Sequence, residues 1–138
     1  MFKMPKGITN YHYFWFSFLL VLILDQISKL FVLRFFPKLV FKSFGVFVGF
    51  NLLWAGFFVA LVVVFFVLFR KLFLQSKLSA SLFGAVIAAA ASNILDRLFW
   101  GAILDWIGVF GFKLNVADFV LIIGGVILIF QFWYNSWD

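Results

Sequence analysis

Long apolar stretches alternate with short segments rich in lysine and arginine along the whole chain. Four of these stretches cover approximately residues 13–33, 52–69, 78–99 and 115–133. A helix needs about 20 consecutive apolar residues to cross the hydrocarbon core of a membrane, and each stretch is close to that length. The pattern therefore predicts an all-α membrane protein with four transmembrane helices, in which residues 1–138 form a single integral membrane domain.

The first apolar stretch begins like a secretory signal, because Lys3 and Lys6 precede it. It is longer than such a segment, it contains Asp25 and Lys29, and no small-residue cleavage pattern follows it. We therefore expect this stretch to be retained as a helix.

The segments between the predicted helices differ in character. Ser43–Phe50 is apolar, contains two glycines and is too short to span a membrane, so we expect an extended or re-entrant piece on the extracytoplasmic side. The third apolar stretch is rich in small residues, which let helix backbones pack closely. The glycine-containing segment 100–114 is expected to be a loop.

Composition narrows the chemistry available to the chain. Hydrophobic residues make up 67% of it and charged residues 12%, too few to cover the surface of a soluble domain. Cysteine is absent, which excludes disulfides and thiol nucleophiles, and the one histidine, His12, cannot build a metal site. The net charge of +6 is thinly spread, so it suits lipid phosphates and topology signals better than nucleic acid. The sequence predicts no cofactor, no metal and no nucleic-acid partner.

The basic residues favour one orientation in the membrane, by five against four. If the N-terminus is cytoplasmic, the basic residues on the inner side are Lys3, Lys6, Arg70, Lys71 and Lys77. Those on the outer side are then Arg34, Lys38, Lys42 and Lys113. With an even number of spans, this predicts that both termini are cytoplasmic.

The five acids of the chain are all aspartates, and Asp138 is the terminal residue. Asp25, Asp96, Asp105 and Asp118 lie in or beside apolar segments, where an ionisable group is costly and usually has a partner or a function. In the favoured orientation they converge on the outer leaflet. Two carboxyl groups that share a water and a proton can act as an acid–base pair without a metal or a covalent nucleophile.

Two of these acids have a structural interpretation. Asp25 and Lys29 are four residues apart, so they can neutralise each other on one helix face. Asn93, Asp96 and Arg97 share another face, which is typical of an ion pair or polar network. Asp105 and Asp118 have no basic neighbour at helical spacing, and this favours a functional role for both.

Four short motifs, in order along the chain, resemble those of the type II signal peptidases, the bacterial lipoprotein signal peptidases. They are Asp25-Gln26-Ile27-Ser28-Lys29, Asn93-Ile94-Leu95-Asp96-Arg97, Ile103-Leu104-Asp105-Trp106 and Leu114-Asn115-Val116-Ala117-Asp118. The chain departs from the family pattern in three places, one of which is a shorter connection between the motifs that contain Asp105 and Asp118. Ala88–Ser92 replaces a glycine-rich run, and Ser43 stands where the family has asparagine.

The resemblance implies an aspartyl endopeptidase that cuts diacylglyceryl-modified prolipoproteins on the amino side of the lipidated cysteine. By the same resemblance Asp105 and Asp118 are the catalytic pair. Residues that would support the site or position the substrate are Asp25, Lys29, Ser43, Asn93, Asp96, Arg97 and Asn115. The expected setting is the bacterial inner membrane, where the protein is a monomer in contact with lipid and its active site faces outward.

Two other functions fit parts of the pattern. A small proton-coupled transporter can also have four spans and a membrane-embedded carboxylate, although its site usually lies at the midplane rather than at one leaflet. A non-catalytic membrane assembly factor descended from the peptidase would tolerate the altered glycines and the missing asparagine.

Overall fold

The protein is described here from a computed structural model that covers residues 10–43 and 52–137. The helices are α1 (Tyr11–Phe35), α2 (Leu52–Phe73), α3 (Lys77–Trp100) and α4 (Val116–Ser136), with a short 3-10 turn η1 (Pro37–Leu39) after α1. The strands are β1 (Phe41–Ser43), β2 (Ile103–Asp105), β3 (Ile107–Val109) and β4 (Phe112–Leu114).

All four helices are long and apolar enough to cross a membrane, so the predicted four-helix membrane fold is confirmed. Each helix overlaps one of the predicted spans and extends slightly beyond it. Most apolar side chains of α1, α2 and α4 point outward, as expected where lipid is the solvent.

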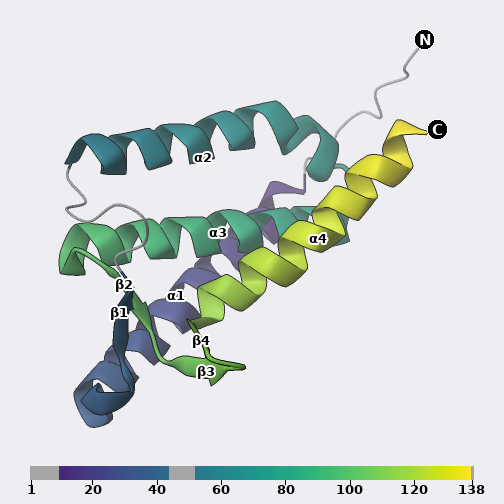
Figure 1. Ribbon diagram of the computed structural model, residues 1–138. Coiled ribbons are helices and arrows are strands. Elements are labelled where there is room, and N and C mark those ends of the chain that lie inside the picture. Colours follow the sequence, from purple (N-terminus) through teal and green to yellow (C-terminus); the bar gives the residue numbers. More distant parts are fainter. Residues whose placement is uncertain (1–9, 44–51, 138) are drawn as a thin grey trace.

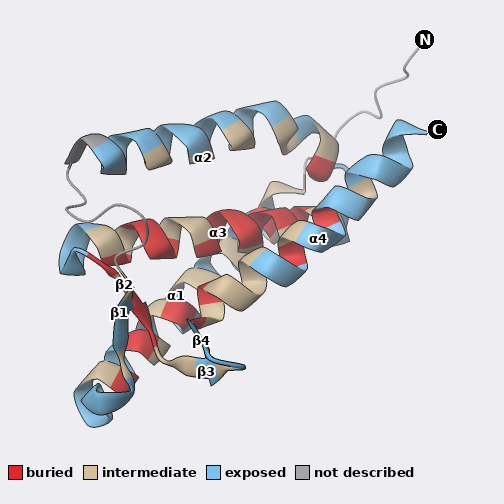
Figure 2. Cartoon of the chain, viewed as in Figure 1, coloured by how far each residue is buried: buried red, intermediate tan, exposed pale blue. Residues whose placement is uncertain are grey.

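Helix α3 lies in the middle of the bundle and contacts the other three helices (Figure 1). It is also the most buried helix (Figure 2). Small residues allow α3 to pack this closely against its neighbours. At Gly84, an added Cβ would lie 2.6 Å from Ser17 Oγ and closer still to a backbone oxygen of α1. The backbones of α1 and α3 therefore pack closely on the faces that they turn towards each other. Towards the other end of the bundle, these same faces carry the polar residues.

The segment predicted as a loop instead forms most of two small antiparallel sheets. Strand β2 pairs with β1, with Phe41 opposite Asp105, and β3 pairs with β4 in a hairpin. The hairpin turns at Phe110 and Gly111, which both have positive φ angles, 46° and 83°. Strands of three residues are too short to show an alternating pattern, which is why the sequence analysis did not detect them.

The re-entrant prediction for Ser43–Phe50 falls mostly on residues that lie outside the described part of the chain. Ser43 itself is the last residue of β1. The strand places it beside β2, at the end of the bundle where α1 and α3 finish and α4 begins (Figure 1).

Candidate active site

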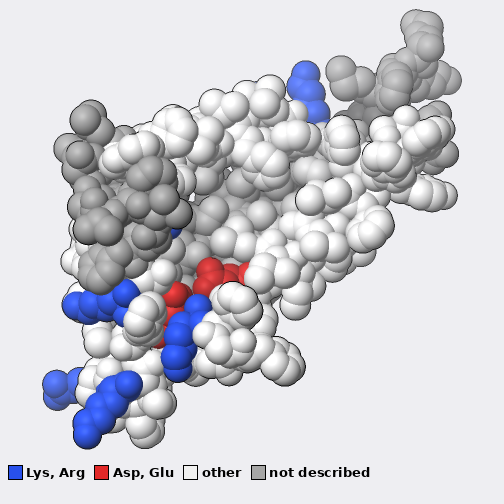
Figure 3. Space-filling view, in the orientation of Figure 1, with Lys and Arg blue, Asp and Glu red and all other residues white. Residues whose placement is uncertain are grey.

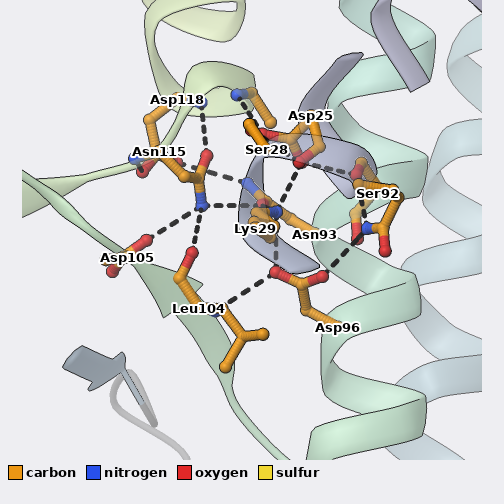
Figure 4. A network of polar contacts seen from close by, with 12 residues as sticks. Asp25, Ser28, Lys29, Ser92, Asn93, Asp96, Leu104, Asp105, Asn115 and Asp118 are labelled. Carbon is orange, nitrogen blue, oxygen red and sulfur yellow. Dashed lines mark hydrogen bonds and ion pairs between the residues drawn. The ribbon is translucent and has the colours of Figure 1, made fainter. Parts of the chain in front are cut away.

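The four aspartates inside the described chain gather at this same end of the bundle (Figures 3 and 4). Asp25 comes from α1 and Asp96 from α3, while Asp105 ends β2 and Asp118 lies in the first turn of α4. The aspartates therefore lie close together, as predicted, and strand β2 as well as the helices places them there.

The start of α4 follows from a local sequence signal. Asn115 caps the helix by accepting a hydrogen bond from the Asp118 N–H at 2.9 Å, and the Asp118 carboxylate accepts one from the Asn115 N–H at 3.0 Å. This reciprocal pair fixes the Asp118 side chain against the helix N-terminus, where a negative charge is stabilised.

Asn115 also holds the second acid of the predicted pair. Its side-chain NH2 donates to Asp105 Oδ1 at 2.8 Å, and the side chain is fully buried. One asparagine thus binds the carboxyl group of Asp105 and the backbone and carboxyl groups of Asp118 (Figure 4).

Asn93 supports Asp118 from the opposite helix. Its NH2 group donates to Asp118 Oδ1 at 3.2 Å, and its oxygen accepts from Lys29 Nζ at 3.2 Å and from Asn115 at 3.1 Å. The Asn93 oxygen contacts only donors, and its NH2 group contacts an acceptor. The network therefore determines which way the Asn93 amide is oriented.

Lys29 lies at the centre of a buried ion cluster. Its ammonium is 2.5 Å from Asp25 and 2.7 Å from Asp96, and none of the three side chains is more than 1% exposed. The predicted pairing of Asp25 with Lys29 is confirmed. For Asp96 the ion-pair partner is Lys29 of α1, whereas the sequence suggested its neighbour Arg97.

The Arg97 guanidinium lies 5.1 Å from the centre of the Phe58 ring on α2 and remains within electrostatic reach of the site aspartates. The family resemblance predicted that Arg97 supports the site, and its helical spacing suggested an ion pair or polar network with Asn93 and Asp96. Spacing along α3 does not show which side chains of α1 and α2 lie beside it. These side chains determine the partners of Asp96 and Arg97.

Asp105 and Asp118 line one cavity of about 330 Å³, together with Ser43 and Lys113. Burial, and to a lesser extent the nearby charge of Asp118, raise the pKa of Asp105 to about 7, although the Asn115 hydrogen bond and the charge of Lys29 act in the opposite direction. Near neutral pH, Asp105 can therefore carry a proton while it faces the same cavity as another carboxyl group.

A second, apolar groove of about 500 Å³ contacts the residue that follows Asp105. It is lined by Trp106 and by side chains of α1 and η1, including Ile27, Phe31 and Phe36. Among the described residues, Trp106 Nε1 is the one buried side-chain donor without an acceptor. The groove is suited to a hydrocarbon chain.

The structure brings together most of the predicted site residues and adds others. The polar residues that contact the site or line its cavity, but were not assigned to it from the sequence, are Gln26, Ser92 and Lys113. Gln26 lies inside a motif already recognised, so its position was a usable signal. Ser92 had none, because its contacts are with another helix. Within residues 10–43 and 52–137 no group of three metal-binding side chains is present.

Comparisons with known proteins agree with this arrangement. A sequence profile described as signal peptidase (SPase) II matches residues 17–134. A lipoprotein signal peptidase of Syntrophomonas wolfei is 33% identical over 84% of this chain and 89% of its own length. One of Thermodesulfovibrio yellowstonii is 31% identical over 83% and 90%.

Two solved structures, both described as bacterial membrane enzymes, share the fold. One has a TM-score of 0.65 at 20% identity and covers 88% of this chain and 87% of its own. The other has a TM-score of 0.63 at 23% identity, over 83% and 88%.

Proposed function

This chain belongs to the signal peptidase II family, and we propose that Asp105 and Asp118 are the two carboxyl groups that hydrolyse the substrate peptide bond. As a member of that family it is a membrane peptidase that removes signal peptides from lipoproteins. The observation that supports the catalytic pair is the shared cavity, in which Asn115 and Asn93 hold both carboxyl groups by hydrogen bonds.

In the proposed reaction a water molecule enters the cavity between the two carboxyl groups. Asp118, whose carboxylate accepts hydrogen bonds from Asn93 and from the Asn115 N–H, is the proposed base and takes a proton from the water. Asp105, whose pKa is raised to about 7, donates its proton to the carbonyl oxygen of the scissile bond. When the tetrahedral intermediate collapses, the C–N bond breaks and the proton on Asp118 goes to the leaving amine nitrogen. One hydroxyl group of the intermediate returns its proton to Asp105, and the other product is a carboxylic acid that carries the oxygen from water.

The substrate is proposed to be a prolipoprotein whose cysteine carries a diacylglyceryl group, with cleavage on the amino side of that cysteine. The apolar groove beside Trp106 supports this choice, because it offers a hydrocarbon chain a place at the residue that follows Asp105. Ser43 and Lys113, at the edge of the cavity, would contact the peptide.

The proposed setting is the bacterial inner membrane, with both termini in the cytoplasm and the cavity on the outer side. The start of α1 contacts the turn between α2 and α3, and α4 ends at the same side of the bundle, opposite the acids (Figure 1). We also propose that the protein acts as a monomer within lipid.

Cleavage by the purified protein in lipid vesicles tests this function. A lipidated precursor should be converted to a product whose mass corresponds to a new N-terminal lipidated cysteine. The same precursor without the lipid is the matched substrate control and should be cut much more slowly, and Asp105→Asn should be inactive. A folded parent protein that cuts neither precursor would contradict the proposal and favour the assembly factor, while proton flux coupled to a solute would favour the transporter.

A further inference from the structure

Five polar side chains form a closed ring between α1 and α3. Lys29 donates to Asp25 and Asp96, Gln26 donates to Asp96 at 2.9 Å and to Ser92 Oγ at 2.7 Å, and the Ser92 hydroxyl donates to Asp25 at 2.6 Å. Four of the five side chains are at most 1% exposed. The two carboxylates are thus joined twice, once through the Lys29 ammonium and once through the neutral pair of Gln26 and Ser92.

Each carboxylate of the ring also binds the backbone that carries one acid of the proposed catalytic pair. Asp96 accepts from the N–H of Leu104 at 3.1 Å, one residue before Asp105. Asp25 accepts from the N–H of Ala117 at 2.8 Å, one residue before Asp118. The ring therefore contacts strand β2 on one side and the N-terminus of α4 on the other.

We propose that this ring is a positioning device that fixes the separation of Asp105 and Asp118, and that Ser92 and Gln26 are positioning residues for the reaction. The proposal rests on the proposed function of the pair. A buried ring closed by hydrogen bonds and ion pairs has one preferred geometry, and it transmits this geometry through two backbone hydrogen bonds.

Ser92 offers the cleanest test, because its hydroxyl bonds to Asp25 and Gln26 rather than to Asp105, Asp118 or the asparagines that hold them. Ser92→Ala opens the neutral link of the ring and leaves Lys29 in place. Ser17→Ala is a matched control. The Ser17 hydroxyl also joins α1 to α3, by a 2.7 Å hydrogen bond to the Ser81 carbonyl oxygen, but near the opposite end of the bundle.

The measurements are kcat and KM for the lipidated precursor and the pH dependence of kcat/KM. In Ser92→Ala we expect kcat to fall about tenfold while KM stays within about twofold, because a loosened pair is misplaced for chemistry rather than for binding. The alkaline limb of the pH profile should move to lower pH, since a more distant Asp118 and a wetter cavity both disfavour the protonated form of Asp105. Ser17→Ala should keep the parent kcat and pH profile.

No other charge near the pair changes in these variants. Among the described residues, the charged groups that lie near Asp105 and Asp118 or on the neighbouring strand β1 are Asp25, Lys29, Lys42, Asp96, Arg97 and Lys113. A shift of the profile in Ser92→Ala alone would therefore report a change in the geometry of the pair.

A second readout keeps the proposal testable without catalysis. The infrared band of the protonated Asp105 carboxyl group, assigned by its loss in Asp105→Asn, should titrate at lower pH in Ser92→Ala than in the parent or in Ser17→Ala. If the parent does not cleave but this shift is seen, the peptidase function fails and the positioning role stands. Parent-like titration and kcat in Ser92→Ala, or equal changes in Ser17→Ala, would overturn the positioning role.

Discussion

The Asn115 side chain makes one hydrogen bond within its own helix start and another to a residue of a different element. Its oxygen caps α4 and thereby fixes Asp118, while its NH2 group holds Asp105 of a different element. The capping half of this role can be read from the sequence, because Asn115 and Asp118 have the spacing of a reciprocal cap. The hydrogen bond to Asp105 cannot be predicted in this way, because it depends on strand β2 placing Asp105 beside Asn115.

Asp105 should make the folded protein less stable at alkaline pH. Its pKa lies at about 7 in the folded state and near 3.8 when exposed, so folding favours the protonated carboxyl group. The stability from this preference is complete below about pH 4 and is lost as the pH rises towards and through 7. Asp105→Asn, which cannot ionise, should therefore raise the melting temperature relative to the parent at pH 8 and much less at pH 4.5.

This comparison uses thermal unfolding of the two proteins in the same detergent at both pH values. Asn can still accept the hydrogen bond from Asn115, so the substitution mainly removes the charge. Equal melting-temperature differences at pH 4.5 and pH 8 would mean that the pKa of Asp105 is not raised.

Residue contacts could be predicted from the sequence only where they are local. The four-residue spacing of Asp25 and Lys29 predicts their ion pair. The second partner of Lys29, Asp96, lies on another helix, and so does the Ser92 hydroxyl that completes the ring. Spacing along one helix carries no information about these partners, which is why Arg97 was expected to be the partner of Asp96.

At the scale of elements, the close packing of α1 against α3 holds the ring side chains within hydrogen-bonding distance of one another. Gly84 is where this packing is tightest, since any side chain there would meet the backbone of Phe14 and the hydroxyl of Ser17. Long apolar helices are visible in the sequence because composition alone marks them. The strands are not, because β1 and β2 are short and come from distant parts of the chain.

Gly84→Ala should destabilise the protein by about 1–3 kcal/mol, because the added methyl group forces α1 and α3 apart. Gly125→Ala is the matched control, since a Cβ on that α4 residue would meet no atom within 4 Å. Unfolding in detergent measures both variants. If Gly84→Ala proved as stable as Gly125→Ala, the close approach of α1 and α3 would be wrong.

At the scale of the whole molecule, acids and bases are distributed unequally. The four described aspartates lie together at one end of the bundle, and Figure 3 shows them bordered by lysine and arginine side chains. The opposite end carries basic residues such as Arg70, Lys71 and Lys77 at the α2–α3 turn. Basic residues at both ends explain why the charge bias for orientation is small.

Orientation can be measured directly, because the chain has no native cysteine. With both termini inside, Lys113→Cys should react with a membrane-impermeant maleimide in intact cells. Lys71→Cys should react only after the membrane is permeabilised. Both side chains are exposed, so access across the membrane rather than burial decides the labelling. The reverse pattern would place the cavity on the cytoplasmic side.

The central claim is that Asp105 and Asp118 act as one catalytic unit. Its most direct test is the cleavage rate of the lipidated precursor by the parent, Asp105→Asn, Asp118→Asn and the double variant in the same vesicles. We expect each single substitution to lower the rate roughly a thousandfold, because Asn can neither accept nor donate the transferred proton. The double variant should be hardly slower than either single variant. Near-parental cleavage by either folded single variant, or losses that multiply in the double variant, would contradict the account.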